Sequence, residues 1–533
     1  MLILCGGLAA LLAAGCGSAG SAARNAILIS VDTLRQDALG CYGNPEVRTP
    51  SIDALARDGV LFRQAFTHAP STLPSHTSML FSNYPWNLGV FRNGDSVPMR
   101  EDSIQQILKQ HGLRTAAFIS LAALSSSYKL SQGFDEYSDV SQHAARPYLF
   151  ADELNDRILT WLSAHHEDPF FLFIHYSDPH EPYIPKDAPA DVEVILNERS
   201  LGTFCFPKRE YHHVGVDLDP GRNSLVFKKM DRSGAPVERE YEIEQLRVGH
   251  AAIRMAAQAG ELAAGDEIRF TDSAELVLHN PTSAPIATEI VLRGKASLGQ
   301  RETRRNYLRE VEWVDRAIGE LVACLRAHDC YEDTIMLLLA DHGEGLGEHA
   351  SFGHESQLYL SQLRIPYVML DHRHVGLDVS SPVTPLDLAP TILSRLGKTR
   401  PQAWKGRDLN ELLDHPAEWD GRQTDILSAT FYSGRGQHAL TNWKFSVLHP
   451  PHHLIITLPM ERYEFYDINA DPGEKRNLIR DSEHPDGYDE LVSSARELAR
   501  QLEEQLRLRK TPDLSPEQIE QLKSLGYLGE TDQ

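Results

Sequence analysis

Acidic and histidine side chains follow several apolar runs of this chain, at the points where buried strands would end. They are Asp32, His175, Asp178, His180, Asp341 and His342. Carboxylate and imidazole groups are ligands that Ca²⁺, Mg²⁺, Mn²⁺ and Zn²⁺ use in proteins. Ligands of open α/β sheets bind at the carboxyl ends of the strands, so these side chains predict a divalent-metal site there. A single aspartate after a strand is more often a helix cap, and the prediction therefore rests on the joint occurrence.

Four short apolar runs would position these side chains. They cover residues 26–31, 115–120, 170–174 and 334–340, and each pattern predicts a buried parallel strand. Helical patterns lie between them: Pro50 opens a helix that Gly59 closes, and Asp102 caps another that ends near Gly112. A longer amphipathic helix covers residues 311–325. Strands that alternate with helices predict an α/β fold with a mostly parallel sheet flanked by helices.

Two further regions differ from this pattern. Within 187–300, the segments 274–279 and 286–292 are typical of antiparallel strands, which predicts an inserted β-rich module. The alternative for this region is a long decorated loop. Beyond residue 424, strand-like segments precede a charged helix over 488–509, which predicts a small antiparallel sheet plus a helix. The predicted organisation is a leader at 1–24, a catalytic α/β domain at 25–186 and 301–424, the module at 187–300 and a C-terminal subdomain at 425–533.

The first residues predict export from the cytoplasm. Residues 2–14 are almost wholly apolar but too few to span a bilayer, which indicates the core of a signal peptide. The run AAGC at 13–16 resembles a bacterial lipobox and predicts that Cys16 carries a lipid. We expect an extracytoplasmic protein, either a periplasmic or outer-membrane-anchored lipoprotein or a secreted protein. Membrane contact is expected only through the anchor at Cys16.

Length and charge narrow the classes of partner. The chain has 533 residues and a formal net charge of −23. Because nucleic-acid binders neutralise phosphates with Lys and Arg, this acidic balance argues against a nucleic-acid partner. An anionic substrate stays open, since a bound metal makes a site locally positive. The cysteines beyond the leader are too sparse for a disulfide scaffold and match no zinc motif, and the pairing of Cys324 with Cys330 stays open.

Several motifs resemble those of the sulfatases, a family of the alkaline phosphatase superfamily. They are VDTLRQD at 31–37, LGCYG at 39–43, TPSIDALA at 49–56, DPHEPY at 178–183, ADHGEGLGEH at 340–349, RIP at 364–366, DLAPT at 387–391 and DPGE at 471–474. These motifs occur in the family's order, from about residue 25 to 528 apart from the region 187–300. The resemblance implies the alkaline phosphatase–sulfatase fold and a sulfatase-like ester hydrolase.

The chain departs from the sulfatase pattern at the nucleophile. The family signature C-x-P-S-R or S-x-P-S-R corresponds here to Thr72-Leu73-Pro74-Ser75-His76. Sulfatases oxidise the Cys or Ser to formylglycine, whereas oxidation of a threonine alcohol would give a ketone. We therefore expect no formylglycine and predict that Thr72 attacks the ester directly. Phosphodiesterases and phosphoethanolamine transferases of the superfamily resemble this pattern. Thr33, where sulfatases have a second aspartate, resembles the leaner metal site of phosphonate monoester hydrolases.

The resemblance implies a set of site residues. The expected ligands of one divalent metal ion (Ca, Mg, Mn or Zn) are Asp32, Thr72, Asp341 and His342, and no organic cofactor is expected. The expected catalytic residues are Thr72, His76, His180 and His354. His180 or His354 would stabilise the equatorial oxygens or protonate the leaving oxygen, and His76 would support Thr72 from behind. His175 and His349 are weaker candidates.

The predicted function is metal-dependent hydrolysis of a sulfate or phosphate ester of a small molecule or glycan. One alternative is a transferase of phosphorylated head groups, although such members usually carry several membrane helices, which the sequence does not predict. Another alternative is a catalytically silent relative that binds glycans. The polar groups retained at the strand ends favour the hydrolase.

Overall fold

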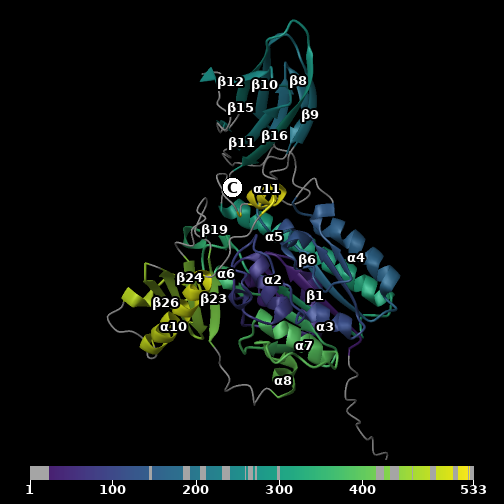
Figure 1. Cartoon of the computed structure of the whole chain (residues 1–533), viewed down its shortest axis with the longest axis vertical. Coiled ribbons are helices and arrows are strands. Elements are labelled where there is room, and N and C mark those ends of the chain that lie inside the picture. Colours follow the sequence, from purple (N-terminus) through teal and green to yellow (C-terminus); the bar gives the residue numbers. More distant parts are fainter. Residues whose placement is uncertain are drawn as a thin grey trace, which may run out of the picture.

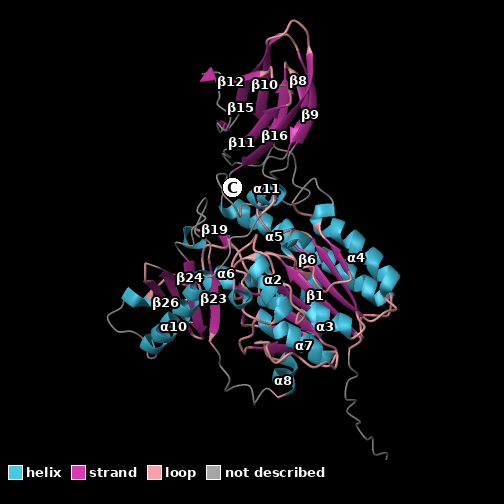
Figure 2. Ribbon diagram, viewed as in Figure 1, coloured by secondary structure: helices cyan, strands magenta, loops and turns pink. Residues whose placement is uncertain are grey.

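The computed structural model describes residues 23–142, 147–183, 192–204, 212–230, 241–257, 260–261, 268–270, 273–296, 300–415, 425–431, 443–458, 460–480, 488–507, 514–525 and 527. These residues form an α/β domain, a stack of antiparallel sheets and a smaller sheet with a helix (Figures 1 and 2). The predicted signal peptide and Cys16 lie outside the described residues. Within the described ranges, we find no helix whose length and apolar character would let it span a bilayer.

An eight-stranded mixed sheet forms the centre of the α/β domain, in the order β22-β2-β21-β17-β1-β6-β4-β5. The strands are β1 (Asn25–Val31), β2 (Val60–Phe62), β4 (Arg114–Ile119), β5 (Glu136–Ser138), β6 (Phe170–Tyr176), β17 (Thr334–Ala340), β21 (Tyr367–Leu370) and β22 (Leu377–Val379). The five strands from β17 to β5 run parallel, and β21 runs antiparallel to β17. The predicted mostly parallel sheet is confirmed. Short pairs are made by β3 (Ala65–Phe66) with β20 (Arg364–Ile365) and by β18 (Gly345–Leu346) with β19 (Phe352–Gly353).

The central strands are covered on both faces. Every residue of β1, β6 and β17 is buried. The helices form two packed groups, one of α1 (Pro50–Asp58), α4 (Ala151–His165) and α5 (Gln300–Ala327), the other of α2 (Thr72–Phe81), α3 (Ile104–Gln110) and α7 (Leu388–Arg395). Short helices α6 (Leu360–Leu363) and α8 (Leu409–Asp414) complete the domain. Strands buried on both faces are continuous apolar runs, which is why the sequence located them.

The structure corrects one helix start. Ser103, and not Asp102, is the N-cap of α3, and its side-chain oxygen accepts a hydrogen bond from the Gln106 N–H. Asp102 instead forms an ion pair with Arg100. The prediction was wrong because Ser and Asp are both favoured caps, so two adjacent candidates are not separated by residue type alone.

Residues 192–296 form two antiparallel sheets, ordered β13-β12-β15-β10-β7-β8 and β14-β11-β16-β9. The strands are β7 (Val192–Leu196), β8 (Arg199–Phe204), β9 (His212–Leu218), β10 (Gly221–Lys229), β11 (Tyr241–Val248), β12 (Arg254–Ala257), β13 (Gly260–Glu261), β14 (Ile268–Phe270), β15 (Ser273–Asn280) and β16 (Ile286–Ala296). Leu225 and Leu276 of the first sheet share a core with Ile290 and Leu292 of the second. The two sheets therefore pack face to face, and Figure 1 shows them projecting from one end of the α/β domain.

The C-terminal region contains a four-stranded antiparallel sheet in the order β23-β24-β25-β26. Its strands are β23 (Ile426–Thr430), β24 (Trp443–His449), β25 (His452–Leu458) and β26 (Arg462–Asp467), and α10 (Tyr488–Arg507) packs against β24. The sequence predicted neither β23 nor the last helix, α11 (Pro516–Ser524). α11 contacts the short helix Ala122–Leu124, and Leu522, Leu525 and Tyr527 join the core of the α/β domain. Helix α11, Leu525 and Tyr527 thus pack against the α/β domain.

Candidate active site

Asp32 and Asp341 stand at the carboxyl ends of two adjacent parallel strands. Val31 of β1 pairs with Ala340 of β17, so the residues that follow these strands are neighbours. β6 pairs with the other side of β1 and brings His175 to the same edge. The carboxyl edge of the parallel strands therefore gathers two carboxylates and an imidazole from three distant parts of the chain, as the sequence predicts for an open α/β sheet.

Asp32, Asp341 and His342 direct buried ligand atoms toward one another. His342 Nε2 lies 3.8 Å from Asp32 Oδ1 and 3.4 Å from Asp341 Oδ2, and all three residues are fully buried. Among the described residues, neither Oδ atom of Asp32, nor Asp341 Oδ2, nor His342 Nε2 has a hydrogen-bond partner. Buried polar atoms are normally satisfied, so a convergent set of unpartnered oxygen and nitrogen atoms fits a divalent cation.

The charges of this cluster also fit a cation. Burial, reinforced by the Asp32 charge, raises the pKa of Asp341 well above its usual range. Burial acts in the same direction on Asp32, but the adjacent His175 ring and the other nearby histidines lower the pKa of Asp32 below its usual value. Burial keeps the pKa of His342 well below its usual value, and Nδ1 of this neutral ring donates to the Gly343 carbonyl. Nε2 of His342 therefore presents a lone pair, as a metal ligand must.

Thr72 is the first residue of α2, a helix in which every residue is buried. One turn along, His76 Nδ1 donates to the Thr72 carbonyl oxygen at 2.7 Å, and His76 Nε2 lies 2.8 Å from the Ser30 hydroxyl. The same His76 ring lies 3.7 Å from Asp341 Oδ2. Burial lowers the pKa of His76 to about 3, so the ring is neutral. His76 thus joins the start of α2 to β1, and the positive end of the helix dipole favours negative charge at Thr72.

His354 places a buried positive charge beside this cluster. Its ring centroid lies 4.6 Å from that of His342 and 4.9 Å from that of His180. His354 Nδ1 is 3.3 Å from Glu344 Oε2. Burial by itself would lower the pKa of His354, but the Glu344 carboxylate raises it to about 10. The protonated His354 ring would attract the anionic oxygens of a sulfate or phosphate ester.

The two weaker candidates lie in different places. His175 is fully buried, with Nε2 at 3.3 Å from Asp32 Oδ2 and Nδ1 at 3.3 Å from the Ser120 hydroxyl. It therefore lies at the site and orients Asp32. His349 is exposed and stacks on Tyr359 with ring centroids 3.7 Å apart. The structure does not bring His349 to the site.

Sequence reasoning missed two residues of this site. Glu344 lies inside the motif that carries Asp341 and His342, so its position was a usable signal. Tyr527 lies far from every motif, yet its hydroxyl is 3.2 Å from Thr72 Oγ1. No local pattern marks a tyrosine in a short C-terminal segment as an active-site residue.

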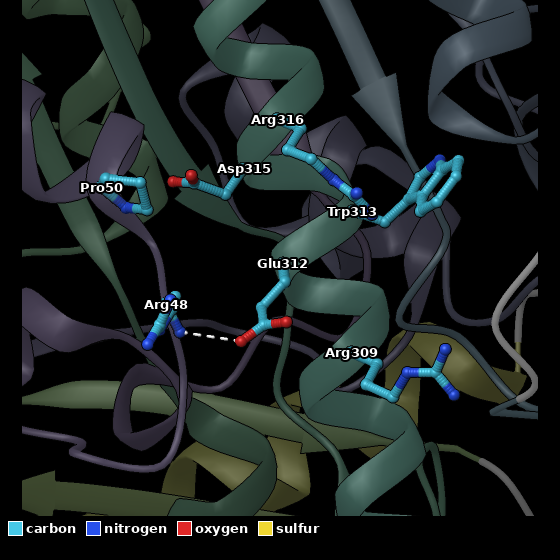
Figure 3. Close-up of a pocket in the computed structure, with 7 residues that line it drawn as sticks. All are labelled: Arg48, Pro50, Arg309, Glu312, Trp313, Asp315 and Arg316. Atoms are coloured by element: carbon cyan, nitrogen blue, oxygen red, sulfur yellow. Dashed lines mark hydrogen bonds between the residues drawn. The ribbon is translucent and has the colours of Figure 1, made fainter.

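Two cavities differ in what lines them. A small one of about 20 Å³ is bordered by Asp178, His180 and Leu525. A larger one of about 350 Å³, drawn in Figure 3, is lined by Arg48, Pro50, Arg309, Glu312, Trp313, Asp315 and Arg316. There the Arg48 backbone N–H donates to Glu312, and Asp315 accepts hydrogen bonds from the first backbone N–H groups of α1. The larger cavity is therefore a joint between α1 and α5 and contains none of the predicted site residues.

The fold and the composition of this site define an enzyme of the alkaline phosphatase superfamily. The family model described as "Sulfatase" matches residues 24–398, and one described as "N-sulphoglucosamine sulphohydrolase, C-terminal" matches residues 347–505. The chain belongs to the sulfatase family. It is a sulfatase-like ester hydrolase, and the predicted family resemblance is confirmed.

Known relatives cover nearly the whole chain at low identity. An ulvan-active sulfatase of Formosa agariphila is 23% identical over 467 residues, covering 85% of this chain and 77% of its own. A structure solved with D-glucosamine-2-N,6-O-disulfate has a TM-score of 0.63 and 18% identity, covering 91% of this chain and 99% of its own. The phosphonate monoester hydrolase of Agrobacterium radiobacter has a TM-score of 0.57 and 18% identity, covering 90% and 95%. At these identities the solved structures support the fold.

Proposed function

We propose that this chain hydrolyses sulfate or phosphate esters with one divalent metal ion held by Asp32, Thr72, Asp341 and His342. The observation that carries the proposal is the set of buried, unpartnered ligand atoms on Asp32, Asp341 and His342. These atoms gather beside a helix whose first residue, Thr72, carries the hydroxyl. A buried donor set of this kind, next to a nucleophile, is the arrangement of metal-assisted ester hydrolysis.

Thr72 is the proposed nucleophile. A divalent cation at this site would balance the two carboxylates, polarise the ester and favour the alkoxide form of a coordinated hydroxyl. Thr72 Oγ1 forms a bond to sulfur or phosphorus while the bond to the leaving oxygen breaks. Water then cleaves the covalent ester on Thr72 and restores the hydroxyl. Because the hydroxyl of Thr72 attacks directly, this route needs no formylglycine, which a secondary alcohol could not form.

The histidines around Thr72 have separate proposed roles. His354, protonated by virtue of Glu344, faces the charge on the equatorial oxygens of the ester. The protonated His354 is also the proposed proton donor to the leaving oxygen, and His180, whose ring adjoins that of His354, would contact the ester oxygens. His76 holds the start of α2 in place through the Thr72 carbonyl. Electrostatic stabilisation and positioning therefore supply most of the proposed catalysis.

The proposed substrate is a sulfate or phosphate ester of a small molecule or glycan. The relatives support a sulfated carbohydrate as substrate, since one is an ulvan-active sulfatase and one solved structure holds a glucosamine disulfate. The likeness to a phosphonate monoester hydrolase and the threonine at position 72 support phosphorus. The location outside the cytoplasm and the lipid at Cys16 remain predictions from the first residues.

The decisive experiment compares aryl sulfate, aryl phosphate, phosphate diester and phosphonate monoester as substrates, with and without added divalent metal. Thr72→Val removes the hydroxyl at constant shape, and we expect it to lower kcat by about 10³-fold or more. Thr77→Val is the matched control, because within the described ranges the Thr77 hydroxyl donates to the Leu73 carbonyl of the same helix. Mass spectrometry of the peptide containing Thr72 should show an unmodified threonine.

Two results would contradict the proposal, the first its nucleophile and the second its reaction. Turnover that survives Thr72→Val would exclude the threonine as nucleophile. Failure to hydrolyse any of the four esters, with metal bound, would leave the head-group transferase and the glycan-binding relative as the remaining functions.

A further inference from the structure

The phenol of Tyr527 lies inside the candidate active site although it belongs to the last described residue of the chain. Its hydroxyl oxygen is 3.2 Å from Thr72 Oγ1 and 2.8 Å from His180 Nε2. Tyr527 is only 8% exposed. Its ring lies edge-on to the rings of His180 and His354, with centroids 5.8 Å and 5.9 Å away. Tyr527 thus contacts the proposed nucleophile and both histidines assigned to the ester oxygens.

The direction of the hydrogen bonds around Tyr527 follows from a carbonyl group. His180 Nδ1 lies 2.9 Å from the Glu181 carbonyl oxygen, which can only accept, so Nδ1 carries the proton. When Nδ1 carries the only proton of the ring, Nε2 accepts a hydrogen bond from the Tyr527 hydroxyl. The Tyr527 oxygen in turn accepts the proton of the Thr72 hydroxyl. In this arrangement Thr72 directs its hydrogen toward Tyr527 and keeps the lone pairs of Oγ1 available for attack.

We propose that Tyr527 is a positioning residue of the ester hydrolase: its hydroxyl sets the rotamer of Thr72 and the orientation of His180 for attack on the ester. The inference deepens the proposed function and rests on it, because it takes Thr72 as the nucleophile. It assigns a role in the active site to the C-terminal segment, 455 positions along the chain from Thr72.

The segment that carries Tyr527 is stably packed against the α/β domain. α11 begins with a capping box in which Ser515 and Gln518 satisfy each other's backbone N–H groups. Leu522 is 1% and Leu525 is 6% exposed, and both belong to the core of the α/β domain. Figure 1 shows α11 between the projecting sheets and the α/β domain. If the C-terminal segment left the site, these leucines would become exposed to water. Their burial therefore favours a segment that stays in place.

The close packing around Leu522 also favours a C-terminal segment that stays in place. Gly94 has φ of +88°, and a Cβ added there would lie 3.0 Å from Leu522 Cδ1. The backbone at Gly94 and the side chain of α11 thus approach each other closely, as in a packed core. The alternative, in which Tyr527 blocks the site until the C-terminal segment is displaced, predicts the opposite effect of removing the hydroxyl.

The test is Tyr527→Phe in the full chain, which keeps the ring and removes the hydroxyl. We expect kcat for the best ester to fall by about 10- to 100-fold, with KM changed less, since one hydrogen bond to a reacting group is lost. Binding of orthovanadate to the metal-loaded protein, measured by calorimetry, should weaken about tenfold. The melting temperature should stay near that of the wild type. Tyr128→Phe is the matched control, because the buried Tyr128 hydroxyl has no hydrogen-bond partner among the described residues.

The outcomes separate this inference from the proposed function. A wild type that hydrolyses esters and a Tyr527→Phe variant with unchanged kcat and vanadate affinity would overturn the inference alone. A rise in kcat would also overturn it, because it would indicate that Tyr527 blocks the site until the C-terminal segment is displaced. If the wild type hydrolyses no ester while vanadate binds more weakly to Tyr527→Phe than to Tyr128→Phe, the positioning role stands and the proposed substrates are wrong.

Discussion

Two buried carboxylates of the α/β domain each follow a strand of the same sheet, but only one has its charge balanced by the chain. Asp371 follows β21 and accepts hydrogen bonds from Arg395 at 2.7 Å and from Arg373 at 3.1 Å. Asp32 follows β1, and neither of its carboxylate oxygens has a hydrogen-bond partner in the described part of the chain. A buried carboxylate with its counter-charge in place marks a structural joint, whereas one that lacks it fits an external cation.

Strand direction explains the difference in location. β21 runs antiparallel to β17, and Leu370 pairs with Met336 near the start of β17. Asp371 therefore lies near the amino ends of the parallel strands, whereas Asp32 and Asp341 lie at their carboxyl ends. Only the carboxyl edge of the parallel strands collects ligands in such folds. A strand-end aspartate is thus informative only when the direction of its strand is known.

The largest contrast should come from neutralising one carboxylate of the proposed metal site, Asp341, and then the paired carboxylate Asp371. We expect Asp341→Asn to lower kcat by about 10³-fold or more, because the proposed metal loses a charged ligand. Metal binding measured by calorimetry should be lost with it. Stability of the metal-free protein should not fall, since the substitution removes a buried charge next to Asp32. A variant that still binds metal with wild-type affinity would remove Asp341 from the ligand set.

Asp371→Asn should give the reverse result. Neutralising Asp371 removes the carboxylate charge beside the buried Arg395 guanidinium, which costs about 3 kcal/mol of unfolding free energy. Urea unfolding at neutral pH measures this loss. The kcat of the folded variant should equal that of the wild type, and a comparable loss of kcat would show that the two clusters are coupled.

Metal should stabilise the protein through only one of the clusters. At a free metal concentration of 100 times Kd, binding adds about 2.7 kcal/mol to the stability of the folded state. The wild type and Asp371→Asn should both show the rise in melting temperature, and Asp341→Asn should not. Equal shifts in all three proteins would place the ion elsewhere.

The smallest expected effect is a loss of folding stability as the pH falls. Burial would raise the pKa of Asp371, but the hydrogen bonds from His374, Arg395 and Arg373 lower it below its usual value. A carboxyl whose folded pKa is lowered contributes stability above its unfolded pKa of about 3.9, and loses it as the pH falls toward the folded pKa. Between pH 5 and pH 3 this loss amounts to about 1 kcal/mol. Asp371→Asn should flatten the stability curve over this interval, and an unchanged slope would assign the acid sensitivity to other groups.

The parts of the site that sequence predicted are those attached to strong local patterns. β1 and β17 are continuous apolar runs, so Asp32, Asp341 and His342 were located as strand-end residues with a shared edge. Thr72 was singled out from the motif around Thr72 and Pro74, whereas the helix α2 that begins there was not predicted. Long buried strands and motif-bearing turns are encoded by neighbouring residues, which is why they are predictable.

The parts that sequence missed depend on distant contacts. β23 has only five residues, so its pattern is weak by itself. The exposed His349 and the buried His354 differ by five positions, and only the folded chain separates them. Residue type marks both as candidates, whereas burial and the nearby Glu344 distinguish His354.

The sequence by itself determined the parallel sheet, the strand-end carboxylates and the choice of Thr72 as the proposed nucleophile, because each depends on residues close together in the chain. Only the tertiary structure decided which strand-end aspartate lacks a counter-charge and that His354 is a buried cation. It also decided that Tyr527 reaches Thr72. Tyr527 and Thr72 are 455 positions apart, and the burial of Asp32 and His354 depends on the packing of several segments. Such contacts are set by how the helices and strands pack, and no local pattern carries them.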